Sequence, residues 1–163
     1  MQQPRKDPDR SQIWKPSVTV AAVVERDGRF LLVEEATNSG MRINQPAGHL
    51  EFGESLVQAV IRETLEETAH DFVPTALLGV YLMPTGTRAD EVTYLRVAFT
   101  GELGNLHTER ALDEGIVRTL WLRREEISAR ATDLRSPLVL RCVDDYRAGR
   151  RAPLDLLQYF PHP

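Results

Sequence analysis

The segment Gly48–His70, GHLEFGESLVQAVIRETLEETAH, contains five glutamates, of which three stand in the short run Arg62–Glu67. Gly53-Glu54-Ser55 is a typical helix start, and the apolar spacing of three and four that follows predicts a helix over residues 57–68. At about 100° per residue, the three glutamates of the run fall on one side of this helix. The predicted sheet-facing stripe lies on another side and consists of Val57, Ile61, Thr64, Leu65 and Thr68.

So many carboxylates on one side of a helix need a reason. Like charges at helical spacing cost a few tenths of a kcal/mol each, and near the helix C-terminus they also oppose the macrodipole. A solvated acidic face usually includes lysines, but this helix has none and only Arg62 is basic. A divalent cation would relieve the repulsion, and carboxylate oxygens suit Mg²⁺ or Mn²⁺. The crowding therefore indicates a metal site, with a solvated acidic face as the plain alternative.

The spacing of these residues resembles the Nudix box, Gly-x5-Glu-x7-Arg-Glu-U-x-Glu-Glu-x-Gly-U, in which U is a bulky aliphatic residue. Gly48, Glu54 and the Arg62–Glu67 run meet its first glycine and all of its polar positions. Three softer positions depart from it, with Thr64 at the first U, Ala69 at the second glycine and His70 at the last U. These departures put the exit turn of the helix in doubt, not the proposed metal ligands.

The resemblance implies an α/β fold, the Nudix α/β/α sandwich with a mixed β-sheet. It also implies that Glu63, Glu66 and Glu67, with the backbone carbonyl of Gly48, hold Mg²⁺ (or Mn²⁺). These three glutamates and Arg62 are the expected catalytic residues, and Arg62 would pair with one of the glutamates, Glu63 for example. The general base stays open between Glu63, Asp113 and Glu114. For Asp113 and Glu114, a role as ordinary loop residues without catalytic function is an equal alternative.

Longer blocks resemble the NudJ phosphatase branch of the same family: 14–35, 44–56 and 134–157. This likeness implies a hydrolase that releases phosphate from small di- and triphosphates: nucleoside di- and triphosphates, thiamine pyrophosphate and hydroxymethylpyrimidine diphosphate. A Nudix pyrophosphatase acting on an oxidised nucleotide, a sugar nucleotide or a dinucleotide is the alternative. A non-catalytic Nudix-fold binding module is a weaker one, because such modules typically lose box acids that are present here.

Substrate contacts are expected outside the helix. His49 follows Gly48 and is placed to touch a phosphate oxygen, and Arg135 is a candidate for an anionic substrate. Ser136 either joins Arg135 or caps a helix beginning at Pro137. Four residues of two predicted strands are candidates for the pocket wall, although alternation does not settle which side they face: Tyr81, Met83, Tyr94 and Arg96.

Length, charge and composition limit the functions and locations that the sequence allows. The chain has 163 residues, a net charge of −4 and a pI near 5.6, which argues against binding of a nucleic acid polymer. Its single cysteine, Cys142, lies in a pattern typical of a buried helix, so a catalytic thiol is the minor alternative. No apolar run is long enough to span a membrane, and a cytoplasmic monomer is the default expectation.

Residues 1–16 are predicted to be a flexible tail, and residues 17–163 one Nudix domain with a C-terminal helix. β-rich runs at 17–25 and 29–35, separated by Arg26-Asp27-Gly28, predict a hairpin. Residues 37–44 are predicted to be a loop. Further strands are expected at 76–84, 91–103 and 115–122, and helices at 123–131 and 136–149.

Overall fold

A computed structural model describes residues 14–86 and 92–161. The strands are β1 (Ser17–Val23), β2 (Glu25–Arg26), β3 (Arg29–Thr37), β4 (Gly40–Asn44), β5 (Ala47–His49), β6 (His70–Thr85), β7 (Val92–Leu106) and β8 (Ile116–Arg123). The helices are α1 (Leu56–Thr68), α2 (Arg124–Ala129) and α3 (Leu138–Arg147), with 3₁₀ turns η2 (Ala131–Asp133) and η3 (Leu154–Leu156).

The strands form two sheets. The first has the order β5-β1-β7-β6 and is mixed, because β1 runs parallel to β7 while the other pairs are antiparallel. In the second, β3 pairs with β2, β4 and β8, all antiparallel. The expected mixed α/β architecture is confirmed.

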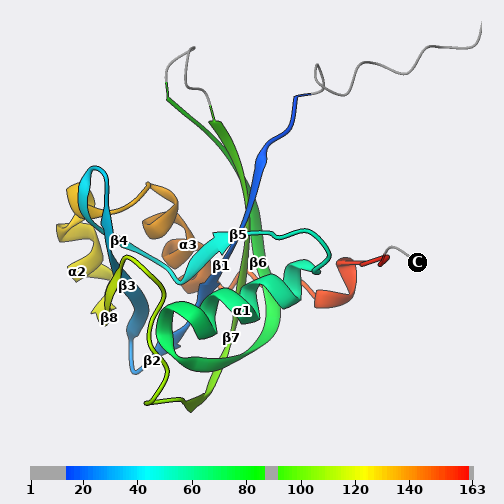
Figure 1. Cartoon of the computed structure of the whole chain (residues 1–163). Coiled ribbons are helices and arrows are strands. Elements are labelled where there is room, and N and C mark those ends of the chain that lie inside the picture. The colour runs from blue at the N-terminus through cyan, green and yellow to red at the C-terminus, as the bar shows by residue number, and fades with distance from the viewer. Residues whose placement is uncertain (1–13, 87–91, 162–163) are drawn as a thin grey trace, which may run out of the picture.

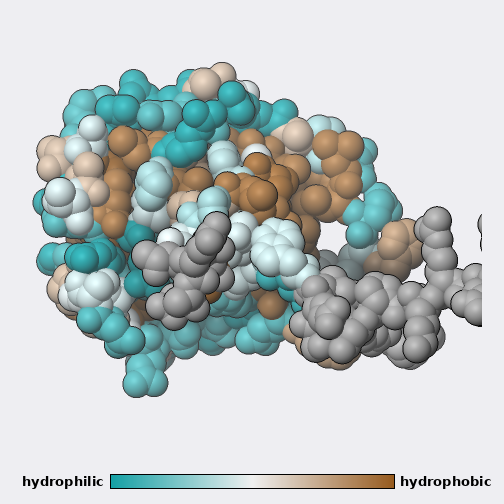
Figure 2. All heavy atoms as spheres, turned by 90° about the horizontal axis from the view of Figure 1, so that it is seen from above, coloured by the Kyte–Doolittle hydropathy of each residue, from teal (hydrophilic) through white to brown (hydrophobic). Residues whose placement is uncertain are grey.

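Helices cover both faces of the central strands (Figure 1), with α1 on one side and α2 and α3 on the other. β1 shows why its sequence is an unbroken apolar run. Val20 and Ala22 pack in the core beneath α1, whereas Ala21 and Val23 pack in the core beneath α3. A strand buried on both faces needs apolar residues at every position instead of alternation. Viewed from above, hydrophobic residues form a band with hydrophilic residues along its margins (Figure 2).

The predicted hairpin exists, but only between β2 and β3. Asp27 and Gly28 both have positive φ, at 53° and 75°, as a tight hairpin turn requires. β1 itself leaves this hairpin and joins the other sheet. The prediction of a loop over 37–44 is wrong, because Gly40–Asn44 forms β4 against β3. The polar composition of this segment conceals a strand in which only Ile43 and Asn44 are buried.

Outcomes for the remaining elements are simpler. Both predicted C-terminal helices are present with shorter bounds, and the Ser136 side chain accepts no capping hydrogen bond from α3. Cys142 is buried in α3, and burial raises the pKa of its thiol to about 11, which disfavours the reactive thiolate form. Most of the predicted tail 1–16 lies outside the described residues. No helix in the described part of the chain is long and apolar enough to cross a membrane.

The exit of α1 resolves the doubt raised by Ala69. This residue has φ 57° and ψ 18°, the left-handed conformation, and its N–H donates to the carbonyl of Leu65. The turn at this position therefore forms with alanine in place of glycine, at a steric cost that glycine would not carry. The helix ends at the expected residue.

We expect Ala69→Gly to raise the free energy of unfolding by roughly 0.5–1 kcal/mol, because relief of the left-handed strain outweighs the added freedom of the unfolded chain. Urea denaturation followed by circular dichroism measures this change. An equal or lower stability of the variant would show that the turn is unstrained.

Candidate active site

The carboxylate side of α1 is buried, not solvated. Glu63 and Glu67 are only 8% and 9% exposed, whereas the predicted stripe residues Val57, Ile61 and Leu65 are half-buried. The stripe prediction is correct for Thr64 and Thr68, which are buried, and for Val57 and Ile61, which pack against the core. It missed that two glutamates point inward as well. Ionised carboxylates lose favourable hydration on burial, so this face of the helix needs positive charge close by.

Arg62 supplies part of that charge. Its Nη1 donates to Glu63 Oε1 at 2.8 Å and to Glu66 Oε2 at 3.1 Å. Its Nε and Nη2 donate to the two carboxylate oxygens of Glu54 at 3.0 and 2.7 Å, and Nη2 also donates to the carbonyl of His49 at 3.0 Å. The expected pairing of Arg62 with Glu63 is present, within a wider network that fixes several box side chains together.

Glu67 lies beyond the reach of this arginine. Its Oε2 accepts a hydrogen bond of 2.8 Å from the backbone N–H of Ala47 in β5. Burial raises its pKa to about 8, and the negative charges of Glu63, Glu35 and Asp113 act in the same direction. Burial also raises the pKa of Glu63, although Arg62 opposes the shift. The electrostatic demand for a cation is therefore greatest beside Glu67.

Gly48 has a reason to be glycine. A Cβ built on this residue would overlap the carboxyl group of Glu63, so β5 and α1 approach too closely for any side chain here. The carbonyl-bearing backbone of Gly48 and the carboxylate of Glu63 thus lie side by side. Between them the chain turns at Gly53, which has φ 92°, and enters α1 at its cap Ser55.

Of the two loop acids, the structure brings Asp113 to this cluster. Its backbone N–H donates to the carbonyl of Glu66 at 3.0 Å, which anchors the loop before β8 on the last turns of α1. Glu114 is exposed and makes no ion pair or side-chain hydrogen bond within the described residues. Sequence reasoning missed Glu35 of β3, whose charge acts on Glu67. The pair Glu34-Glu35 offered no signal, because the facing of each depends on strand pairing.

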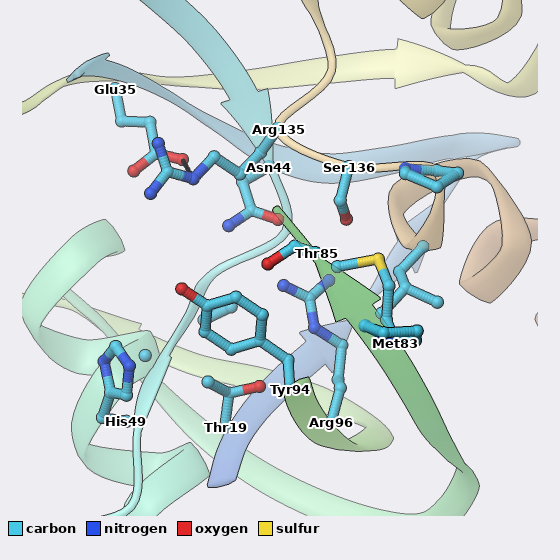
Figure 3. A pocket seen from close by; sticks show the side chains of 15 residues that line it. Thr19, Glu35, Asn44, His49, Met83, Thr85, Tyr94, Arg96, Arg135 and Ser136 are labelled. Atoms are coloured by element: carbon cyan, nitrogen blue, oxygen red, sulfur yellow. Dashed lines mark ion pairs between the residues drawn. The ribbon is translucent and has the colours of Figure 1, made fainter. Parts of the chain in front are cut away.

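A pocket of about 590 Å³ adjoins the carboxylates. Figure 3 shows its lining, drawn from both sheets and from the segment before α3: Thr19, Glu35, Asn44, Ala47, Gly48, His49, Met83, Pro84, Thr85, Tyr94, Arg96, Arg135, Ser136, Pro137 and Leu138. β5 is the shared wall, because Ala47 and Gly48 line the pocket and also contact Glu67 and Glu63.

The structure places both predicted substrate contacts at this pocket. His49 lies at one end with its ring 6.3 Å from that of Tyr94, and Arg135 lies at the other end, 3.7 Å from Glu35 Oε1. Of the uncertain strand residues, Met83, Tyr94 and Arg96 line the pocket. Tyr81 lies deeper and donates to Asp145 at 2.9 Å.

A comparison with known families fits this arrangement. The model of the NUDIX domain matches residues 14–142, from the start of the described chain into α3. The chain belongs to the NUDIX family. The box glutamates, Gly48 and all the residues that line the pocket lie inside the matched region, so the resemblance inferred from Gly48–His70 is confirmed for the family.

Relatives place this Nudix hydrolase close to one branch. Phosphatase NudJ of Escherichia coli (strain K12) and that of Shigella boydii are each 39% identical to it over 151 residues, 93% of this chain and 96% of the relative. A NUDIX hydrolase structure from Nitrosomonas europaea is 50% identical, with a TM-score of 0.85, and the match covers 90% of this chain and 98% of that one. The NudJ-like character inferred from the longer blocks is confirmed.

The raised pKa of Glu67 predicts a pH-dependent stability in chelator-treated protein. Between the ordinary value of 4.5 and about 8, the folded chain keeps a proton that the unfolded chain has released. The free energy of unfolding should therefore fall as the pH rises through this window, and Glu67→Gln should flatten the fall. Urea denaturation at about pH 5 and about pH 8.5 measures it. Parallel pH profiles for the two proteins would contradict the assignment.

Proposed function

We propose that this Nudix hydrolase is a Mg²⁺-dependent enzyme, with Mn²⁺ as a possible substitute, that cleaves phosphoanhydride bonds of small di- and triphosphates and releases phosphate. The observation that carries the proposal is the buried pair Glu63 and Glu67 beside a pocket that also presents two arginines. NudJ phosphatases, 39% identical over nearly the whole chain, support the release of phosphate. Nucleoside di- and triphosphates, thiamine pyrophosphate and hydroxymethylpyrimidine diphosphate are the proposed substrates.

The donor set fits a divalent cation. Glu63, Glu66, Glu67 and the Gly48 carbonyl are oxygen ligands of the kind that Mg²⁺ prefers, and the glycine leaves room beside Glu63 that a side chain would fill. Among the described residues, no three His, Cys, Asp or Glu side chains are already gathered as an assembled site, since Arg62 engages Glu63 and Glu66. Small rotations of these two side chains would release oxygens for the ion.

When bound, Mg²⁺ offsets charge on the phosphate oxygens and lowers the pKa of a water molecule. The protein's own groups do the remaining work. Arg62 orients Glu63 and Glu66 and limits their mutual repulsion. The backbone of Ala47 orients Glu67. A carboxylate outside the metal's ligand set can take the proton of the attacking water. Asp113 is a better candidate for this than Glu114, because its backbone N–H donates to Glu66 and its charge acts on Glu63 and Glu67.

The phosphate-bearing end of the substrate is assigned to β5, where His49 opens onto the pocket beside Gly48. The rest of the substrate extends toward Arg135. We further propose a cytoplasmic, monomeric enzyme that acts on a small molecule and has neither a nucleic acid polymer nor a membrane as partner. The free, buried Cys142 is compatible with a reducing compartment.

A substrate panel with Mg²⁺ tests the function, with orthophosphate and pyrophosphate assayed separately. We expect orthophosphate from nucleoside and thiamine diphosphates, and a loss of roughly 100-fold or more in kcat/KM for Glu67→Gln, because several kcal/mol of charge stabilisation depends on the metal. Glu51→Gln is the matched control, since it makes the same change at an exposed glutamate of the same segment.

Other results would change the specificity or the function that we assign. Pyrophosphate, or paired monophosphates from a dinucleotide or sugar nucleotide, would keep the Nudix chemistry but assign another specificity. Full activity of Glu67→Gln would disprove the metal site. No Mg²⁺-dependent product from any compound, with retained binding, would favour a binding module.

A further inference from the structure

The pocket collects polar atoms that lack partners. Within the described residues, five buried side-chain polar atoms have no hydrogen-bond partner: Thr19 Oγ1, Glu35 Oε1, Asn44 Oδ1, Arg96 Nε and Ser136 Oγ. All five belong to residues that line the one pocket beside the carboxylates. Each unmade hydrogen bond of a buried group costs about 1–3 kcal/mol, so their gathering in one place points to a ligand that completes them.

Of the five residues, Arg96 carries the polar group with the greatest unmet need for hydrogen-bond partners. It is 7% exposed, and its guanidinium makes a single long hydrogen bond, 3.4 Å, to the amide oxygen of Gln45. Burial lowers its pKa, which reflects the poor solvation of its charge. Figure 3 shows the guanidinium at the middle of the pocket next to the Tyr94 ring. A ligand that accepts hydrogen bonds would supply what the protein does not.

The unpartnered carboxylate oxygen of Glu35 and amide oxygen of Asn44 instead need a ligand that donates hydrogen bonds. Asn44 is 7% exposed, and its Oδ1 accepts nothing. Glu35 Oε1 lies 3.7 Å from Arg135 Nε, too far for a hydrogen bond. The Ser136 and Thr19 hydroxyls can adapt to either role. The pocket thus offers hydrogen-bond donors at Arg96 and acceptors at Glu35 and Asn44.

We infer that the pocket selects substrates whose ring carries an amino group beside a ring-nitrogen acceptor, and that Glu35 and Arg96 are the residues that determine this preference. The amino group donates to Glu35 and Asn44, and the ring acceptor receives from Arg96. In a ring with a keto oxygen beside an N–H, the donor and acceptor positions are exchanged. Its keto oxygen would then face the acceptors Glu35 and Asn44, and its N–H would face the donor Arg96. This inference rests on the proposed hydrolysis of small diphosphates and names the class of ring that the same site prefers.

Other side chains that line the pocket also suit such a ring. Tyr94 offers an aromatic face, and Met83 and Leu138 contribute apolar surface. Glu35 Oε1 is screened from water by its neighbours, among them Arg135, whose side chain is 46% exposed and held only by the 3.7 Å ion pair. Rotation of Arg135 toward solvent would open Glu35 to a ligand without disturbing the strands.

Four nucleoside diphosphates with the same ribose diphosphate test the inference. Cytidine and adenosine diphosphates carry the amino pattern, whereas uridine and inosine diphosphates carry only the keto pattern. We expect kcat/KM to favour the amino pair by at least about tenfold, the size of one or two mispaired buried groups. Glu35→Gln, whose amide can donate to a keto oxygen, should reduce this preference by about tenfold. Glu34→Gln is the matched control, because Glu34 pairs with Arg118 away from the pocket.

The outcomes separate the inference from the proposed function. Equal cleavage of all four compounds would overturn the ring preference and leave the hydrolase intact. A uniform loss for all four in Arg96→Met would place a phosphate at Arg96 and would also overturn it. If none is cleaved, calorimetric titration of the unaltered protein with cytidine and uridine diphosphates in Mg²⁺ decides the matter. A tenfold tighter cytidine compound would support the preference, and equal or absent binding would overturn it.

Discussion

The burial of Glu63 and Glu67 on a helix with one arginine is the constraint on which the rest of the structure depends. Two carboxylates on one inward face would repel each other and lose hydration unless positive charge lies against them. Arg62 meets part of this demand through Glu54, Glu63 and Glu66, and the Ala47 N–H meets another part at Glu67. The remaining demand is the physical basis for assigning a divalent cation to this place.

The same constraint explains the backbone around α1. β5 must come close enough for its N–H to reach Glu67, and only glycine at position 48 permits that approach beside Glu63. The approach places β5 between the carboxylates and the pocket, so one short strand joins the proposed reacting end of the substrate to its recognition end. The positions of the metal ligands and of the pocket are thus set by the same packing contact.

Much of this could be predicted from residue spacing, because a helix repeats every 3.6 residues and Glu63, Glu66 and Glu67 must share a side. The start of α1 was also predictable from local signals, whereas the left-handed exit turn at Ala69 was in doubt without a glycine there. β4 was not, because few of its side chains are apolar. Glu35 and Arg96 belong to strands, where the facing of a residue depends on its register with distant partners, and one sequence does not carry that register. The sequence named Arg96 as a candidate for the pocket wall, but its facing, and the presence of Glu35 in the pocket, had to come from the structure.

The position of the metal is the central claim, and diffraction from crystals soaked in Mn²⁺ tests it most directly through the anomalous signal of the ion. We expect a peak bounded by the carboxylates of Glu63, Glu66 and Glu67 and the carbonyl of Gly48, with oxygens of Glu63 or Glu66 turned from Arg62 to the ion. A peak elsewhere in the protein, or none here with the Arg62 ion pairs unchanged, would contradict it.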